Sequence, residues 1–119
     1  MNINAALNEL LEVEGATAAA VVDYKTGMML GSAGTGVDLE IAAAGNTEVV
    51  RAKLKTMQML GLDEKIEDIL ITLNTQYHMI RPLEREEDLF IYYVLDSAKS
   101  NLALARRKLK KVESELQVD

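Results

Sequence analysis

The glycines between residues 31 and 36 come nearest in this chain to the spacing of a known chemical site. The stretch Gly31-Ser-Ala-Gly-Thr-Gly36 follows a strand-like run and precedes a helix-like run. Glycines at such a junction form the loops that bind nucleotide phosphates. Gly31 and Gly36 satisfy the first half of the Walker A spacing, G-x-x-x-x-G, so a nucleotide site has to be considered.

The two residues after Gly36 argue against a phosphate site. A Walker A loop continues with Lys, which reaches the β- and γ-phosphates, and with Ser or Thr, whose hydroxyl binds magnesium. This chain has Val37 and Asp38 instead. The Asp38 carboxylate is a good helix cap, so it would occupy the N–H groups that a phosphate needs and would repel it. The dinucleotide pattern G-x-G-x-x-G is not matched either. We therefore interpret the glycines as a structural corner.

The remaining reactive residue types do not combine into a catalytic set. The chain has one histidine and no cysteine, so disulfides, thiolate chemistry and histidine-based metal clusters are excluded. His78 lies in a predicted strand without a serine or carboxylate at a motif spacing, which favours a structural or exposed histidine over a catalytic base. Residues 84–88 are acidic but lack the glycine and terminal glutamate of a calcium loop, which favours a solvated turn. We predict a protein that is not an enzyme and holds no cofactor or metal.

A basic run, Arg106-Arg-Lys-Leu-Lys-Lys111, raises the question of nucleic acid or an anionic membrane. The whole chain is acidic, with a net charge of −6, which disfavours nucleic acid as a partner. Apolar residues also recur along this segment at spacings of four and three, as in a helix that packs on a sheet. The cations then occupy its solvated side toward the C-terminal end, where the helix dipole favours them. The apolar positions are Ala98, Leu102, Ala105, Leu109, Val112 and Leu116.

Length and composition indicate one domain over residues 1–119. The chain has 119 residues, of which 49% are hydrophobic, enough for one compact core. The N-terminal segment MNINAALNELLEVEG has no basic region, so it is not a signal peptide. Every uncharged run is shorter than the ~18 residues that a membrane span requires. We expect a cytoplasmic protein without membrane insertion.

The order of predicted elements is that of an α+β domain. Amphipathic or apolar runs bounded by Gly, Asn and Asp predict helices over residues 2–13, 39–60 and from Asp96 or Ser97 to about Leu116. Strands are predicted over 17–23, 28–30, 66–73, 77–81 and 89–95, several of them joined by hairpin-like turns. One antiparallel sheet with helices packed on its faces is the simplest architecture for this order.

The predicted helix over residues 39–60 has two apolar stripes and one polar arc. A helix that lies on a sheet in a monomer needs only one such stripe. The second stripe consists mostly of small residues, so either the helix is buried on all sides or the stripe is a self-complementary dimer face, which we favour. The first stripe comprises Leu39, Ala43, Val50, Leu54 and Met57, the second stripe comprises Ile41, Ala42, Gly45, Val49, Ala52 and Met59, and the polar arc comprises Glu40, Thr47, Glu48, Arg51, Lys55 and Gln58.

Several segments resemble Roadblock-type domains, the family of the dynein light chain Roadblock. Glu14-Gly-Ala-Thr-Ala-Ala-Ala-Val-Val-Asp-Tyr-Lys-Thr-Gly27 is similar to the opening of that family, in which a glycine-containing turn leads to a strand and then to a polar turn ending in glycine. Ile80-Arg-Pro-Leu83, Leu89-Phe-Ile-Tyr-Tyr-Val-Leu-Asp96 and Asn101-Leu-Ala-Leu-Ala-Arg106 are also similar. The resemblance covers nearly the whole chain and lies in the order of elements and the positions of the glycines.

The resemblance implies a profilin-like, five-stranded antiparallel sheet in the order αββαβββα. The long second helix would cover one face and the terminal helices the other. Family members are homo- or heterodimers joined by the second helix and the following strand, which adds Ile69, Ile71 and Leu73 to the expected interface. They are non-enzymatic scaffolds: dynein light chains in eukaryotes, and partners or regulators of small Ras-like GTPases in prokaryotes. The full third helix of this chain is similar to the prokaryotic type.

Two classes of function follow from these observations. The leading hypothesis is a homodimeric adaptor that binds and regulates a small GTPase through an outward mixed-charge surface of Glu48, Arg51 and Lys55. Mixed charge suits a reversible protein contact, because electrostatics steer the encounter more than they set affinity. The alternative is a small-molecule-sensing or other regulatory module. The glycines near Gly31 and the lack of convergent polar groups in any strand argue against an interior ligand site.

Overall fold

One open five-stranded sheet organises the molecule. The computed structural model describes residues 1–118, and every neighbouring pair of strands in it is antiparallel, in the order β2-β1-β5-β4-β3. This confirms the predicted α+β class and the order αββαβββα. The elements are α1 (Ile3–Leu11), β1 (Ala16–Asp23), β2 (Met28–Gly34), α2 (Leu39–Met59), β3 (Ile69–Thr72), β4 (Gln76–Pro82), β5 (Leu89–Asp96) and α3 (Leu102–Glu115).

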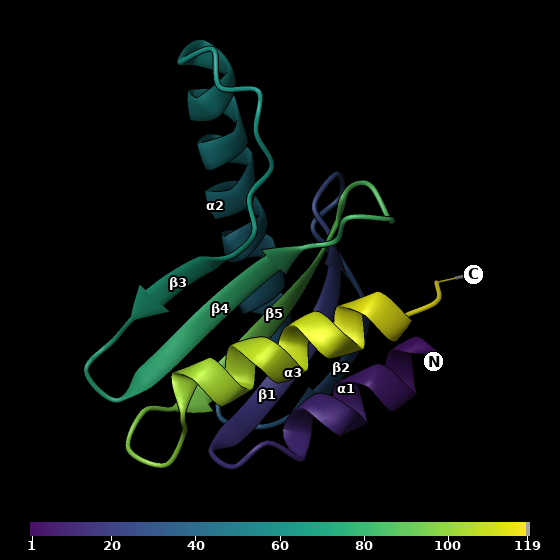
Figure 1. The fold of residues 1–119 in the computed structure, drawn as a ribbon, viewed down its shortest axis with the longest axis vertical. Coiled ribbons are helices and arrows are strands. Elements are labelled where there is room, and N and C mark those ends of the chain that lie inside the picture. Colours follow the sequence, from purple (N-terminus) through teal and green to yellow (C-terminus); the bar gives the residue numbers. More distant parts are fainter. Residues whose placement is uncertain (119) are drawn as a thin grey trace.

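The helices cover the two faces of the sheet unequally. Helices α1 and α3 lie side by side on one face, and α2 lies on the other (Figure 1). Helix α2 contacts β1 and β2, at one side of the sheet. Its C-terminal half extends beyond the sheet, and the chain returns along it to reach β3 (Figure 1). The face of β3 and β4 on the α2 side therefore lacks a helix packed along it within the described chain.

Two hydrophobic cores result, one on each face, and β5 contributes to both. Side chains alternate across a strand, so Phe90, Tyr92 and Val94 enter the α2-side core, while Ile91, Tyr93 and Leu95 enter the core under α1 and α3. Every residue from Leu89 to Leu95 is buried. The Tyr93 hydroxyl donates a hydrogen bond to the Leu10 carbonyl oxygen at 2.6 Å, which ties the end of α1 to the central strand.

Side-chain caps set the helix starts, as predicted for Asp38 at the start of α2. The Asn2 side chain accepts from the Ala5 N–H at 2.8 Å, and the Asp38 carboxylate accepts from the Glu40 and Ile41 N–H groups at 3.1 and 3.2 Å. The predicted start of the last helix at Asp96 or Ser97 is wrong. Residues 97–99 form a turn, and Asn101 caps α3. Ala98 is therefore exposed rather than part of the packed stripe.

Strand β2 is longer than predicted and includes two of the glycines that we assigned to a corner. Gly31 and Gly34 lie within β2, and the chain turns later, around Gly36. A Cβ on Gly31 would lie 2.6 Å from Cγ2 of Ile3, because α1 packs directly on the backbone there. A Cβ on Gly34 would lie 2.1 Å from the Thr17 carbonyl oxygen. These glycines serve close packing, and Gly36 makes the corner.

Strand β3 is shorter than the predicted range of 66–73. It begins at Ile69, because the preceding backbone is held by side chains instead of a neighbouring strand. The Glu67 carbonyl oxygen accepts a hydrogen bond from Nη1 of Arg81 at 3.1 Å, and the Asp68 carboxylate accepts two from Arg106. Leu73 lies one residue beyond the end of β3.

Candidate interaction surface

The second stripe of α2 is exposed, whereas the first stripe packs toward the sheet. Ala43, Val50 and Met57 of the first stripe are buried. In the second stripe, Ile41 is 70% exposed, Val49 38% and Met59 76%. Gly45 and Ala52 are also exposed, and Ala42 is half-buried. Deep burial of the helix on all sides, the alternative reading of the sequence, is therefore wrong for the single chain.

Apolar exposure continues past the end of α2 at residues that the sequence analysis did not include. Leu60 is 65% exposed and Leu62 45%. They flank Gly61, whose positive φ of +73° turns the chain at the projecting tip of the helix. The sequence did contain a signal for this exposed surface, namely two leucines on either side of the glycine that ends the helix. Together with the second stripe, they leave a strip of apolar surface along the whole helix.

The free edge of β3 is a second surface that the described chain leaves without a partner. Strand β3 pairs with β4 in regular antiparallel register, and its other edge is unpaired within residues 1–118. Ile69 and Ile71 pair with Ile80 and His78, and both isoleucines are half-buried. The opposite sheet edge, β2, carries a β-bulge at Leu30, which is a common way of blunting an edge. The β3 edge has no such bulge.

The polar arc of α2 is partly tied to the β1–β2 turn. The Arg51 guanidinium forms an ion pair with Glu48 at 3.2 Å and donates to the Lys25 carbonyl oxygen. The Lys25 ammonium in turn lies 3.2 Å from the Asp88 carboxylate, a hydrogen bond that raises the pKa of Lys25. Glu48, Arg51 and Lys55 are exposed, so the structure brings the three predicted partner residues together on one surface.

Thr47 does not belong to the exposed arc, contrary to the sequence prediction. It is buried, and its hydroxyl donates to the Ala43 carbonyl oxygen at 2.7 Å. This bond within the helix satisfies the hydroxyl, so Thr47 can face the interior without an unpaired polar group. Helical periodicity alone groups Thr47 with the polar residues, because the spacing of residues does not reveal a hydrogen bond from a side chain to the backbone of its own helix.

His78 lies on the α2 side of β4 in a small polar cluster. The Tyr92 hydroxyl is 3.0 Å from Nδ1, and Oε1 of Gln76 is 2.7 Å from Nε2. The glutamine oxygen only accepts, so Nε2 carries the proton and Nδ1 accepts from Tyr92. Burial lowers the pKa of His78 and raises that of Tyr92. Both imidazole nitrogens are satisfied in the neutral ring, as expected for a structural histidine.

We expect the imidazole of His78 to titrate with a midpoint below 6.5. Burial opposes the charged form, so the unfolded state binds more protons than the folded state at pH values just below 6.5. This contribution to stability is complete above the unfolded pKa and is lost as the pH falls. NMR titration can follow the signal without ambiguity, because the chain has one histidine. Tyr92→Phe should raise the midpoint by removing the donor to Nδ1, and a wild-type midpoint of 6.5 or higher would contradict the expectation.

We expect no nucleotide binding by the isolated protein. The corner after β2 is occupied by the Asp38 carboxylate, which already accepts from two N–H groups at the start of α2. A phosphate would have to displace this negative charge, and no lysine follows Gly36. Titration with fluorescent GTP and ATP analogues should show no saturation below about 1 mM, where binding is worth only ~4 kcal/mol. Micromolar saturation would show that our interpretation of the corner is wrong.

The cavities of the described residues are shallow. One hollow of about 230 Å³ lies between the segment after α2 and the β4–β5 turn. It is smaller than the ~300 Å³ at which ligand pockets begin, whereas two more open hollows, of about 520 and 400 Å³, lie beside α3 and between β2 and the start of α2. The wall of the first hollow combines apolar side chains such as Leu54 and Ile66 with several glutamates. No cluster of three potential metal ligands occurs among the described residues. None of the described helices is long and apolar enough to cross a membrane.

Comparisons with known proteins establish the fold. No family model and no curated protein matches the sequence. Among solved structures, MglB from Myxococcus xanthus is 21% identical, with a TM-score of 0.83 over 95% of this chain and 89% of that one. A Roadblock/LC7 domain from Streptomyces avermitilis is 9% identical, with a TM-score of 0.82 over 97% and 94%. An MglB with a tetrameric arrangement is 18% identical, with a TM-score of 0.81 over 94% and 82%. The chain has a Roadblock-type fold, as its sequence resemblance predicted.

Proposed function

We propose that this chain, with its Roadblock-type fold, is a non-enzymatic homodimeric adaptor that binds and regulates a small Ras-like GTPase. The observation that carries the proposal is the exposed second stripe of α2, together with the unpaired edge of β3. Monomeric proteins rarely expose a long contiguous apolar patch, and such a patch usually marks an interface. The similarity to an MglB with a tetrameric arrangement is consistent with self-association.

A twofold dimer would satisfy both features with one arrangement. If the β3 edges of two copies pair antiparallel, their sheets become continuous and the unpaired backbone groups are satisfied. Helix α2 of each copy then lies next to the partner's, with the second stripes in contact. The projecting half of α2 would extend over the part of the partner's sheet, around Ile69, Ile71 and His78, that its own helix leaves uncovered.

The proposed GTPase surface is the exposed part of the polar arc, around Glu48, Arg51 and Lys55. In the dimer these residues would remain on the outside of the paired helices. Arg51 is held by Glu48 and by the β1–β2 turn, so the surface is preorganised. The described residues show no arginine that projects freely from this surface. We therefore expect any effect on hydrolysis to come from positioning the switch loops of the GTPase itself.

The experiment is a pull-down from the native lysate with the dimer as bait and with GTP-analogue or GDP added. We expect mass spectrometry to identify a small GTPase that is recovered preferentially in one nucleotide state. Lys55→Glu should reduce its recovery, and Arg51→Glu with Lys55→Glu should abolish it, because charge reversal opposes the encounter. Arg51 also contacts the β1–β2 turn, so the thermal unfolding of both variants must be compared with that of the wild type.

The matched control reverses two charges on the opposite face. Lys99 and Lys111 are exposed and lie in the turn before α3 and in α3 itself. Lys99→Glu with Lys111→Glu changes the net charge as much as the double variant on α2 and should leave recovery of the GTPase intact. Equal loss in both double variants would assign the effect to net charge. Recovery of no GTPase in either nucleotide state would contradict the proposal and leave a scaffold with another partner.

A further inference from the structure

The solvent face of α3 carries a strip of positive charge on an otherwise acidic protein. Arg106, Arg107, Lys110 and Lys111 are all exposed, and they form two pairs separated by four residues. Residues at this spacing lie next to each other on a helix, and like charges there repel. We call these four residues the α3 basic strip. It lies on the face of the sheet opposite α2 (Figure 1).

The helix dipole does not explain the α3 basic strip. The favourable effect of a cation falls off within the last turn of a helix. The last turn of α3 contains no basic residue, and the arginines lie near the middle of the helix. The expectation from the sequence, that the dipole at the C-terminal end accounts for these cations, is therefore wrong. Repulsion among these cations destabilises the isolated helix, and the helix dipole does not compensate for it.

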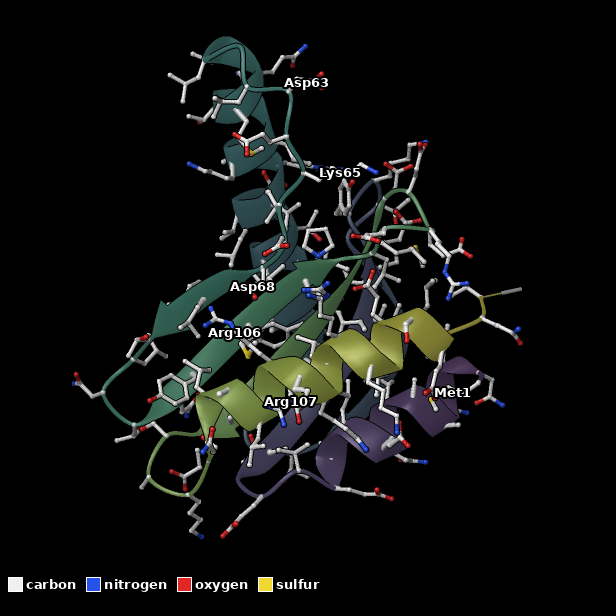
Figure 2. The ribbon with its side chains drawn as sticks, viewed as in Figure 1. Met1, Asp63, Lys65, Asp68, Arg106 and Arg107 are labelled. Carbon is white, nitrogen blue, oxygen red and sulfur yellow. The ribbon has the colours of Figure 1, made fainter. Side chains whose placement is uncertain are left out.

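The rest of the described chain neutralises little of the strip. Arg106 forms a two-pronged contact with the Asp68 carboxylate, with Nε–Oδ2 and Nη2–Oδ1 distances of 3.1 and 3.0 Å. Figure 2 shows these two side chains facing each other, with Arg107 farther along α3. Arg107, Lys110 and Lys111 form no ion pair with any residue from 1 to 118. Three positive charges are therefore left available.

An open groove runs beside the strip. One hollow of about 520 Å³ is lined by Arg81, Arg106, Arg107 and Lys110 together with Glu67 and Asp68. A second hollow of about 240 Å³ shares Arg81 and Lys110 with it and continues toward Arg85. The floor between them is neutral, because the buried Arg81 guanidinium is paired with the Glu113 carboxylate, with an Nε–Oε1 distance of 2.5 Å. Besides Arg107 and Lys110, the groove is lined by Arg85, Glu67 and Glu84, none of which forms an ion pair with a described residue.

We infer that this groove binds an extended acidic peptide segment of a partner protein. Charge complementarity supplies the argument: Arg107 and Lys110 line the first hollow, Lys110 also lines the second, and their unpaired positive charges match carboxylates of the segment. A continuous polyanion fits less well, since Glu67 and Glu84 also line the groove and would repel it. The overall charge of −6 further disfavours nucleic acid and anionic membranes.

The test measures fluorescence anisotropy with a labelled synthetic peptide of alternating glutamate and glycine. We expect saturable binding at low salt that weakens as salt screens the charges. Arg107→Glu with Lys110→Glu should reduce the affinity about tenfold or more, because exposed charge pairs contribute modestly and reversal adds repulsion. These two side chains make no ion pair in the described chain, so the fold should be retained, which thermal unfolding checks.

A matched control separates the groove from net charge. Lys53→Glu with Lys55→Glu changes the net charge equally on α2, where both lysines are exposed, and should leave the peptide affinity within about twofold. NMR shifts on titration should cluster on α3 and on residues 67–68. Absence of saturation, equal loss in both double variants, or tighter binding of phosphatidylserine vesicles or single-stranded DNA than of the peptide would each overturn the inference. The GTPase pull-down tests Arg51 and Lys55 on α2, outside the groove, and the peptide titration tests Arg107 and Lys110, so the two proposals fail separately.

Discussion

Val49→Glu is expected to convert a dimer of the 13.1 kDa chain into a monomer. Val49 is 38% exposed in the single chain and lies in the middle of the second stripe of α2. In the proposed dimer it would be buried against the partner helix. Burial of an unpaired carboxylate opposes association by several kcal/mol. Light scattering coupled to size exclusion should report the mass of one chain for the variant and of two for the wild type.

The position of the added carboxylate on α2, rather than the added charge itself, should decide whether the dimer forms. Ala52→Glu, one turn farther along the same stripe, should act like Val49→Glu. Gln58→Glu adds a negative charge to the same helix, but at an exposed position of the polar arc, and it should remain dimeric. Both stripe positions are accessible in the single chain, so circular dichroism should show a retained fold. If both stripe variants remain dimeric, or if the wild type is a monomer, the proposed interface is wrong.

Gly34→Ala is expected to destabilise the fold by about 3 kcal/mol or more, since left-handed backbone strain and overpacking both oppose the new methyl group. Gly34 has a φ of +92°, and its Cβ would lie 2.1 Å from the Thr17 carbonyl oxygen and 2.7 Å from Cα of Ala18. These are backbone atoms of β1, so the sheet would have to open to make room. Urea unfolding followed by circular dichroism measures the change in the free energy of unfolding.

Gly36→Ala is the matched control for the role of space. Gly36 has a similar φ of +99°, but no heavy atom lies within 4 Å of the position that its Cβ would take. This substitution should cost only the backbone strain, about 1–2 kcal/mol. A Gly34→Ala variant no less stable than Gly36→Ala would show that β1 yields easily at this point, contrary to our reading of the contact.

Features that depend on neighbouring residues could be predicted from the sequence. Asp38 caps α2 as expected, because a cap involves N–H groups two and three residues away. The apolar run of β5 is buried throughout, and the first stripe of α2 faces the interior. For the candidate site, the same periodicity placed Ile41, Val49 and Met59 on an exposed surface of the helix. The spacing of apolar residues in one helix shows that this surface is apolar, but it does not show whether a second chain covers it.

Features that depend on distant contacts were missed. Gly31 and Gly34 belong to β2 because α1 and β1 pass close to their backbone, which a local reading of a glycine-rich segment cannot detect. Strand β3 begins after its predicted start because Arg81, 14 residues away in sequence, donates a hydrogen bond to the Glu67 carbonyl oxygen. Arg51 was assigned to a free surface, yet it reaches the turn at Lys25. In each case a contact between segments overrides the local pattern.

The alternation of side chains along β5 has a consequence for how such a protein can evolve. Phe90, Tyr92 and Val94 belong to one core, and Ile91, Tyr93 and Leu95 belong to the other. Substitutions on opposite faces share few side-chain contacts, and the effects of distant, independent substitutions are additive. Selection can therefore change the outer surface of α3 without altering α2, and the reverse. A sheet with two separate cores would let one small domain change its surface on one side while it keeps its surface on the other.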